Sequence, residues 1–386
     1  MENLFAEHNR EVSEVWARFW AGDPIRMPVI VGVSDRYFVL NPETNPGGVS
    51  FREYSEDPRL MFEMQARFAH YRRTRIPGDC EMGTPEEGWT VNVDFQNYYE
   101  AAWLGAEVRF PDGEVPYAVP LLTGDQKELL FARGLPDPFG GFMATAREYY
   151  ERFREWAPKT VVEGQRVGPV GLPFMGTDGP FTLACELRGP DRLCLDLYED
   201  PDYVRQLMDF LTESILLRLS AWRQYLDEPV QSGGFGFADD SILLLSEEMY
   251  REFVLPYHKR LAEALSTGEE KGFCHCCGDA ARHFKTMRDE LNIGVFDTGF
   301  PVRHAELVRE LGPETVIQGG VPAELVRTGP PEAIAEASRE IIESVKPLTR
   351  RFIFREGNDI PPGTPLAHMW ALYEAGKQYG RYESGR

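Results

Sequence analysis

Apolar positions along this chain occur in two patterns that alternate. Short runs rich in β-branched and aromatic residues have the length of single strands, whereas the longer stretches between them repeat apolar residues every three or four positions, as helices do. The runs lie at 27–34, 167–174, 232–240, 271–279, 292–299, 315–321 and 351–359. The helical stretches lie at 194–226, with a break at Pro201, and at 246–268, 279–291, 302–311 and 330–346. Alternation at this spacing predicts parallel strands covered by helices.

The number of runs favours a closed architecture over an open sheet. About eight strand candidates in one chain of this length predict an α/β fold, a (β/α)8 barrel of the TIM type. No GxGxxG motif and no GxxxxGK(S/T) motif occurs, so neither nucleotide-binding fingerprint is present. The amphipathic start, MENLFAEHNREVSEVWARFW, predicts additional N-terminal helices over 1–25. We expect a single domain over 1–386, with Pro/Gly-rich loops at 41–48 and 134–142 over the barrel mouth.

Composition narrows the partners and the compartment. The 386 residues include 62 acidic and 41 basic residues, a net charge of -21, which argues against binding to nucleic acid or to an anionic membrane surface. No run of roughly 18 apolar residues is present, so no membrane-spanning helix is expected. The start lacks the basic and apolar regions of a secretory signal. These features predict a cytoplasmic protein whose thiols stay reduced.

The expected strands end in polar or metal-competent residues. In a barrel of this type the chemistry collects where strands end and loops begin, so side chains at these ends should surround one pocket. The alternative is that Asp and Asn at strand exits act as helix caps and turn formers. The residues concerned are Asp239, Asp240, His275, Cys277, Asp297, Gln318, Glu356, Asn358 and Asp359.

The stretch GFCHCCG at 272–278 is the most specific chemical signal in the chain. In an extended segment His275 and Cys277 share one face, whereas Cys274 and Cys276 share the other. Imidazole and thiolate at a strand end suit zinc, with a third ligand expected from Asp297, Glu356 or Cys276. Two alternatives remain open, a redox pair at Cys274–Cys277 and inert buried thiols.

The two consecutive aspartates after the run at 232–240 carry a separate expectation. Asp239 and Asp240 are candidate catalytic residues that orient a substrate or act as a base. Their alternative role is hydrogen bonding within the barrel mouth. The aromatic-rich segments 95–110 and 137–153 could line a pocket for a planar ligand, or could form the cores of helices.

Several longer stretches resemble one known family, in the family's order. They include GPFTLACELRGPDRLCLDLYEDPDYVRQLMDFL, FADDSILLLSEEMYREFVLPYHKRL, FCHCCGDA, VIQGGVPAELVRTGPPEAIAEASREII and FIFREGNDIPPGTPLAHMWALYEAGKQYG. The chain resembles the uroporphyrinogen decarboxylase superfamily and, within it, the cobalamin-dependent methyltransferases. The resemblance implies a TIM-type barrel. It also implies that His275 and Cys277 match the His-x-Cys pair that holds zinc in those methyltransferases, together with a later cysteine.

Two departures from the family pattern bear on the reaction. The decarboxylases carry an arginine-rich stretch that grips substrate carboxylates, whereas MPVIVGVSDRYFVLNP contains only Arg36. The later cysteine of the methyltransferases falls in EGNDIPPGTP, where Asn358 stands in its place. An oxygen ligand instead of a thiolate would make zinc a stronger Lewis acid. That change would favour activation of a methyl ether or an alcohol over a thiol.

The resemblance and the residues together predict a zinc-dependent methyltransferase. It would move a methyl group between a small methyl ether, alcohol or thiol and a corrinoid, with O-demethylation as one direction. No D-x-H-x-x-G motif is present, so the cobalamin is expected on a separate corrinoid protein. The sequence leaves a homodimer open. The alternatives are uroporphyrinogen decarboxylase itself and a non-catalytic barrel that binds a tetrapyrrole or corrinoid.

Overall fold

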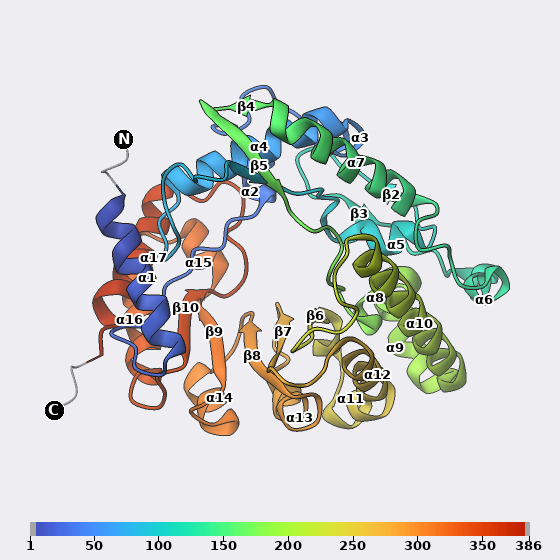
Figure 1. Ribbon diagram of the computed structural model, residues 1–386. Helices are drawn as coiled ribbons and strands as arrows, with labels where there is room; N and C mark the ends of the chain where they lie inside the picture. The colour runs from blue at the N-terminus through green and yellow to red at the C-terminus, as the bar shows by residue number, and fades with distance from the viewer. Residues whose placement is uncertain (1–4, 383–386) are drawn as a thin grey trace.

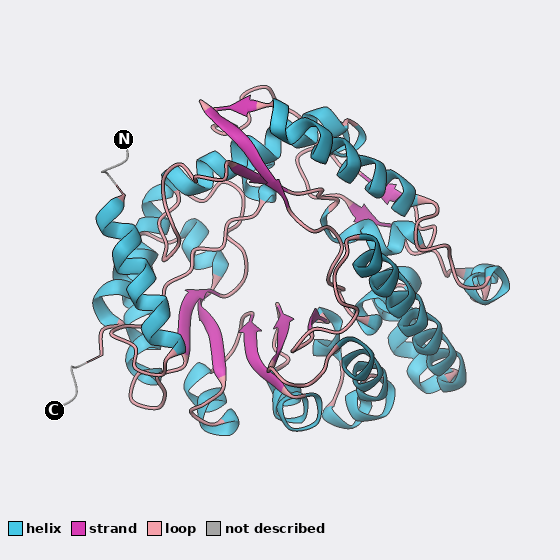
Figure 2. Cartoon of the chain, in the orientation of Figure 1, coloured by secondary structure: helices cyan, strands magenta, loops and turns pink. Residues whose placement is uncertain are grey.

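The protein is a ring of strands surrounded by helices, as the computed structural model shows for residues 5–382 (Figure 1). Strands line the inside of the ring and helices cover its outside (Figure 2). Five parallel strands form one continuous sheet in the order β10-β9-β8-β7-β6. They are β6 (Gly236–Ala238), β7 (Gly272–Cys276), β8 (Ile293–Thr298), β9 (Val316–Val321) and β10 (Phe352–Glu356). This arrangement confirms the predicted α/β fold of the TIM type.

The other side of the ring is built from shorter strands. β1 (Trp89–Val91) pairs in parallel with β5 (Gln165–Val170), and β4 (Val161–Val162) lies antiparallel on β5. A small hairpin joins β2 (Val108–Arg109) and β3 (Tyr117–Ala118). Beyond β5, the carbonyl of Thr177 accepts a hydrogen bond from the amide of Ala238, so this segment continues the ring to β6. Among the described residues, β5 and β6 belong to separate sheets, so the strand pairing around the ring is not continuous.

The run at 27–34 forms less of a strand than its sequence predicts. It lies parallel to β10 through a single bridge between Val29 and Phe354. Phe354 donates to the carbonyl of Pro28 at 2.9 Å, and Ile30 donates to the carbonyl of Phe354 at 2.9 Å. Because Pro28 has no N–H group, it cannot donate to a ladder, and proline is confined to strand edges and ends. The segment still occupies the expected first strand position.

Helices in the second half follow the strands as predicted, with one correction. Prolines begin several of them, since the first turn needs no N–H donor. The expected stretch 194–226 is broken at Pro201, and the Asp200 side chain caps the second helix by accepting from the amide of Tyr203. The expected helix at 246–268 is two helices, because Pro256 cannot donate to the preceding turn. These helices are α8 (Pro180–Arg188), α9 (Pro190–Glu199), α10 (Pro201–Tyr225), α11 (Glu247–Phe253), α12 (Leu255–Leu265), α13 (Ala281–Leu291), α14 (His304–Leu311), α15 (Ala323–Thr328), α16 (Pro331–Val345) and α17 (Leu366–Tyr379).

The first half carries the remaining helices. The amphipathic start forms the first of them, and residues 1–4 of the expected extension lie outside the described residues. The α-helices are α1 (Ala6–Trp20), α2 (Asp35–Leu40), α3 (Phe51–Glu56), α4 (Pro58–Arg75), α5 (Tyr99–Trp103), α6 (Leu129–Arg133) and α7 (Phe142–Trp156). Residues 5–382 also contain four short 3₁₀ helices: η1 (Gln96–Tyr98), η2 (Gly124–Gln126) and η3 (Ala157–Lys159) in the first half, and η4 (Asp240–Leu244) after β6.

The buried side chains explain where the aromatic segments go. Much of the aromatic content of 95–110 and 137–153 is buried in a hydrophobic cluster that extends from Met27 to Tyr373. These rings therefore belong largely to the core, which was the simpler of the two interpretations. Within residues 5–382, no helix combines the length and the apolar character needed to cross a membrane.

Candidate metal centre

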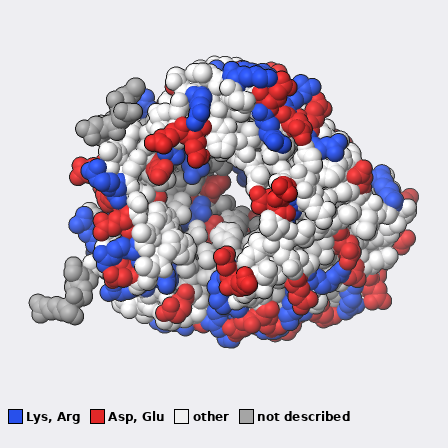
Figure 3. Space-filling view, viewed as in Figure 1, with Lys and Arg blue, Asp and Glu red and all other residues white. Residues whose placement is uncertain are grey.

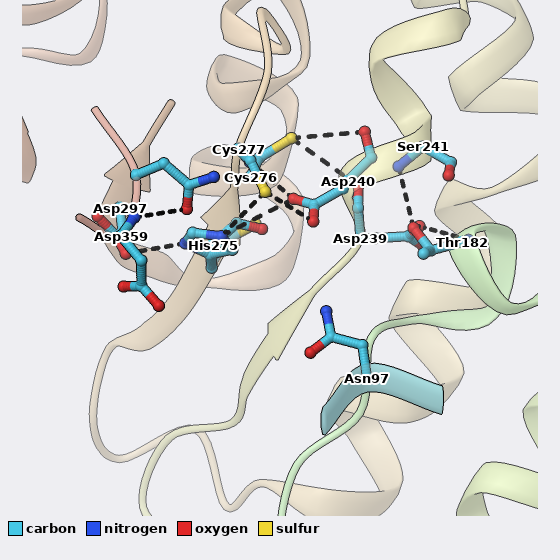
Figure 4. A network of polar contacts seen from close by, with 12 residues as sticks. Asn97, Thr182, Asp239, Asp240, Ser241, His275, Cys276, Cys277, Asp297 and Asp359 are labelled. Atoms are coloured by element: carbon cyan, nitrogen blue, oxygen red, sulfur yellow. Dashed lines mark hydrogen bonds and ion pairs between the residues drawn. The ribbon is translucent and has the colours of Figure 1, made fainter. Parts of the chain in front are cut away.

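Three predicted site residues meet at the carboxyl ends of β6 and β7. One ligand atom each from Asp240, His275 and Cys277 lies within 4.8 Å of the others (Figure 4). The Cys277 Sγ lies 3.4 Å from His275 Nε2 and donates a hydrogen bond of 2.8 Å to Asp240 Oδ2. His275 Nε2 lies 3.9 Å from Asp240 Oδ1. An imidazole nitrogen, a sulfur and a carboxylate oxygen therefore converge on one point.

Parallel pairing of β6 with β7 brings these residues together. Ala238 is the register partner of His275, so residues that follow both strands leave the sheet at the same edge. The backbone N–H of Cys277 donates to Asp240 Oδ1 at 2.6 Å and fixes that carboxylate. Side chains on β7 alternate, with Cys274 and Cys276 buried and His275 partly accessible. The face assignment made from the sequence is confirmed.

Cys276 and Cys274 do not join the triad. Both are buried on the opposite face of β7, with 0% and 1% of their surface exposed. Burial, and then the charge of Asp240, raises the pKa of the Cys276 thiol to about 12. These two thiols therefore belong to the core, and the alternation also separates Cys274 from Cys277.

Asp297 on β8 contacts His275 from the side away from the triad. Its Oδ2 lies 2.8 Å from His275 Nδ1, which leaves Nε2 directed at Asp240 and Cys277. Burial of the imidazole favours its neutral form, but the hydrogen bond and the charge of Asp297 raise the pKa of His275 above its usual value. Asp297 was predicted to be a ligand. The structure places it as the partner of the other ring nitrogen, outside the triad.

Glu356 and Asn358 also lie outside the triad. Glu356 is fully buried at the end of β10, where its Oε1 accepts from the backbone N–H of Gly32 at 3.1 Å and from Arg355 Nη2 at 2.9 Å. The Asn358 side chain is exposed, and its Oδ1 accepts from the amide of Asp359. Neither side chain therefore supplies the ligand that the family pattern would provide through a cysteine at position 358.

The two consecutive aspartates do different things. Asp239 is fully buried, and its carboxylate accepts from the N–H groups of Phe181 and Thr182 and from the Thr182 hydroxyl at 3.2, 2.8 and 2.7 Å. His258 Nε2 lies 2.9 Å from the same group. Asp239 therefore caps α8, as the alternative interpretation allowed, whereas Asp240 faces the triad.

The sequence analysis did not predict a set of hydrogen-bonded polar side chains that follow the run at 27–34 and β1. The Gln96 amide donates to Asp35 Oδ1 at 3.1 Å and to Asp94 Oδ2 at 2.6 Å. Burial and the neighbouring Asp35 raise the pKa of Asp94 well above its usual value. Arg36 donates to Gln96 Oε1 at 2.6 Å and to Asn97 Oδ1 at 2.8 Å. Figure 4 shows Asn97 with its amide directed toward the side where the triad lies.

Further carboxyl groups lie on the segment that follows β5 and on α8. Burial raises the pKa of Asp178 to about 7, and the charges of Glu100, Asp240 and Asp239 add to this effect. Burial, with Asp178 and Glu100, raises the pKa of Glu186 to about 9. The space-filling view is hollowed at the centre of the ring, with charged side chains beside the hollow (Figure 3). The only sequence signal for Asp178 was its place after a predicted strand.

The triad fits a zinc ion by donor type and by spacing. Tetrahedral zinc with bonds of about 2.0–2.3 Å holds its ligand atoms about 3.4–3.6 Å apart. The 3.4 and 3.9 Å separations at His275 Nε2 lie close to that range, whereas Cys277 Sγ and Asp240 Oδ2 are 2.8 Å apart in a thiol hydrogen bond and would have to separate when an ion replaces the thiol proton. One thiolate and one carboxylate would balance the charge of the ion. Three protein ligands leave a fourth position open, which is typical of catalytic zinc sites.

Comparison with known proteins assigns the family. The sequence model described as uroporphyrinogen decarboxylase (URO-D) matches residues 18–379, and the chain belongs to this family. A uroporphyrinogen decarboxylase from Prochlorococcus marinus is 22% identical over 95% of this chain and 97% of that protein.

Methyltransferases of the family match a shorter part of the chain. A methylated-thiol–coenzyme M methyltransferase from Methanosarcina mazei is 28% identical over 52% of this chain and 51% of that protein. A methylcobamide:CoM methyltransferase from Methanosarcina acetivorans is 24% identical over 54% and 59%, so the match spans just over half the length of these relatives. A solved methyltransferase from Methanosarcina mazei shares the fold, with a TM-score of 0.65, 17% identity and coverage of 95% and 98%.

Proposed function

We propose that this protein is a zinc-dependent methyltransferase that moves a methyl group between a small substrate and a corrinoid carried by a separate protein. The observation that carries the proposal is the convergence of Asp240, His275 and Cys277 at one point of the barrel mouth. Methyltransferases among the relatives, and the match of His275 and Cys277 to the zinc-binding pair of the cobalamin-dependent members, support it.

Asp240 is the third ligand in this proposal. It supplies a negative oxygen where Asn358 stands in place of the family's cysteine, so the charge of the ligand set is kept while one sulfur is lost. Cys277 supplies the thiolate, and His275 binds through Nε2 because Nδ1 contacts Asp297. The hydrogen bond from the Cys277 amide holds the Asp240 carboxylate toward the other two donors.

The reaction breaks the bond between the methyl carbon and a heteroatom of the substrate. The electron pair of that bond stays on the heteroatom, so any group that stabilises negative charge there accelerates the step. Zinc at the triad would supply a Lewis acid for this purpose. An aspartate oxygen donates less electron density than a thiolate. The site is therefore suited to a methyl ether or an alcohol rather than a thiol.

Uroporphyrinogen decarboxylation is the second candidate, favoured by the full-length decarboxylase relative. Its substrate carries several carboxylates, which require several available cations. Arg355 is paired with Asp297 and Glu356, and Arg218 is paired with Glu100. Arg36 is held by two amide side chains and has no carboxylate partner among the described residues. One available guanidinium suits a small donor better than a polycarboxylate.

A methyl-transfer assay tests the proposal. Zinc-loaded protein is incubated with reduced free cobalamin and, in turn, methyl ethers, methanol and methylated thiols, and methylcobalamin is followed by its absorbance. We expect formation with an ether or an alcohol and none with a His275→Ala variant. Decarboxylation of uroporphyrinogen without any methyl transfer would overturn the proposal. Transfer from a thiol far faster than from any ether would overturn the substrate preference.

A further inference from the structure

Arg355 on β10 is connected to the triad through one carboxylate oxygen. Its Nη1 donates to Asp297 Oδ2 at 2.8 Å, and the same oxygen lies 2.8 Å from His275 Nδ1. A carboxylate that takes partners from two sides has little freedom to rotate. The orientation of the His275 ring is therefore tied to the position of a guanidinium on another strand.

The guanidinium is itself held in place. Arg355 is only 8% exposed, and its Nε and Nη2 donate to Glu356 Oε1 at 3.2 and 2.9 Å. Asp359 lies 3.6 Å from Nη2. Glu356 Oε1 also accepts from the backbone N–H of Gly32, in the first strand position. The chain of contacts thus runs from His275 on β7, through β8 and β10, to the segment at 27–34.

Two glycines make room for this chain. β9 lies between β8 and β10, and the register partner of Arg355 on β9 is Gly320. A Cβ at Gly320 would collide with the Arg355 carbonyl oxygen, and a Cβ at Gly32 would collide with the Arg355 guanidinium and with Glu356. Neither glycine has a positive φ, so backbone conformation does not require glycine at either position. At Gly32 the space is needed for the Arg355 guanidinium and Glu356, and at Gly320 it is needed for the backbone of β10.

We propose that Arg355 is a positioning residue of the metal centre: it holds Asp297 in the orientation that turns His275 Nε2 toward Asp240 and Cys277. In this arrangement Asp297 contacts the metal ligand and is not itself a ligand. Outer partners of this kind fix the ring orientation of metal-bound histidines, and their loss typically lowers metal affinity about 10- to 100-fold. The inference rests on the proposed metal centre.

The test measures metal affinity, without any activity assay. Zinc affinity is determined by competition with a chromophoric chelator for the wild type, Arg355→Met, Arg355→Lys and Asp297→Asn. Arg351→Met is the matched control, since Arg351 precedes β10 and donates to the carbonyl of Phe19, away from the triad. Cobalt(II) in place of zinc reports the number and type of ligands through its visible spectrum.

Arg355→Met and Asp297→Asn are expected to bind zinc about 10- to 100-fold more weakly than the wild type. The loss should be smaller for Arg355→Lys, and Arg351→Met should bind zinc as tightly as the wild type. All should bind one cobalt with the wild-type spectrum. Asp297→Asn is isosteric and keeps the test decisive if Arg355→Met does not fold. Unchanged affinity in both variants, or a spectrum that loses a ligand in Asp297→Asn, would overturn the positioning role. A wild-type protein that binds no metal would instead overturn the proposed centre itself.

Discussion

At the scale of single residues, the site depends on whether each polar side chain at a strand end points into the core or toward the barrel mouth. Asp239 and Asp240 are adjacent in sequence, yet one is buried under α8 and the other faces His275 and Cys277. The sequence marked both as catalytic candidates and could not rank them without the register of β6 against β7. The side of His275 and Cys277, in contrast, followed directly from alternation along one strand.

The third ligand can be tested by exchanging its donor atom. Asp240→Ala removes one of three ligands and should lower zinc affinity by more than about 100-fold, the upper end for loss of an outer partner. Asp240→Cys restores a negatively charged donor and should retain most of the affinity. Chelator competition provides the measurement. Equal affinity in wild type and Asp240→Ala would exclude Asp240 from the ligand set.

Asp239→Asn tests the neighbouring aspartate, which should affect stability and not zinc binding. Its carboxylate accepts several hydrogen bonds at the start of α8, and an amide nitrogen there would face donors instead of accepting from them. We expect a loss of about 1–3 kcal/mol in the free energy of unfolding, the usual cost of an unsatisfied buried group. Denaturant unfolding measures this loss. Zinc stoichiometry should stay at the wild-type value, and a variant that loses zinc while keeping its stability would contradict the assignment.

At the scale of elements, the sequence pattern predicted which segments exist better than where they end. The sequence at 246–268 predicts one continuous helix, because its apolar period passes through Pro256. In the structure the helix is interrupted at Val254, two residues before that proline. The run at 27–34 has strand composition, but Pro28 cannot donate and the Val29 amide bonds to the side chain of Asp79 instead of a strand, so the run keeps one bridge to β10. The short polar connections that carry Asp94, Gln96 and Asp178 have no periodicity, and their chemistry becomes visible only in three dimensions.

Helix α8 carries a carboxyl group whose ionisation should oppose folding. The pKa of Glu186 is raised to about 9, above its unfolded value, so the folded state binds its proton more tightly. Its favourable contribution is present at low pH and is lost as pH rises toward 9. Glu186→Gln should therefore stabilise the protein at pH 8 by at least about 1 kcal/mol relative to its effect at pH 5, the equivalent of one pKa unit.

Thermal or denaturant unfolding of both proteins at the two pH values gives this difference. The matched control is Glu199→Gln, at the exposed end of α9. An equal effect of Glu186→Gln at pH 5 and pH 8 would contradict the raised pKa.

At the scale of the whole molecule, the fold and the family were predictable because the patterns that indicate them extend over most of the chain. Strand–helix alternation indicated the barrel, and long stretches that resemble the family in the family's order indicated the superfamily; both are confirmed. The complete ligand set was not predictable, since Asp240 comes from a different strand end than His275 and stands more than thirty residues before it. Asn358 signalled that a ligand was missing, and the fold supplies a candidate for its replacement.

Zinc content is the measurement that tests the account most directly. Purified protein would be assayed by elemental analysis beside a variant carrying both His275→Ala and Cys277→Ala, with folding of the two compared by circular dichroism. We predict about one zinc per chain in the wild type, the number expected for a single three-ligand site, and none in the folded variant. No zinc in the wild type, even after reconstitution, or equal zinc in both proteins would contradict a metal centre at Asp240, His275 and Cys277.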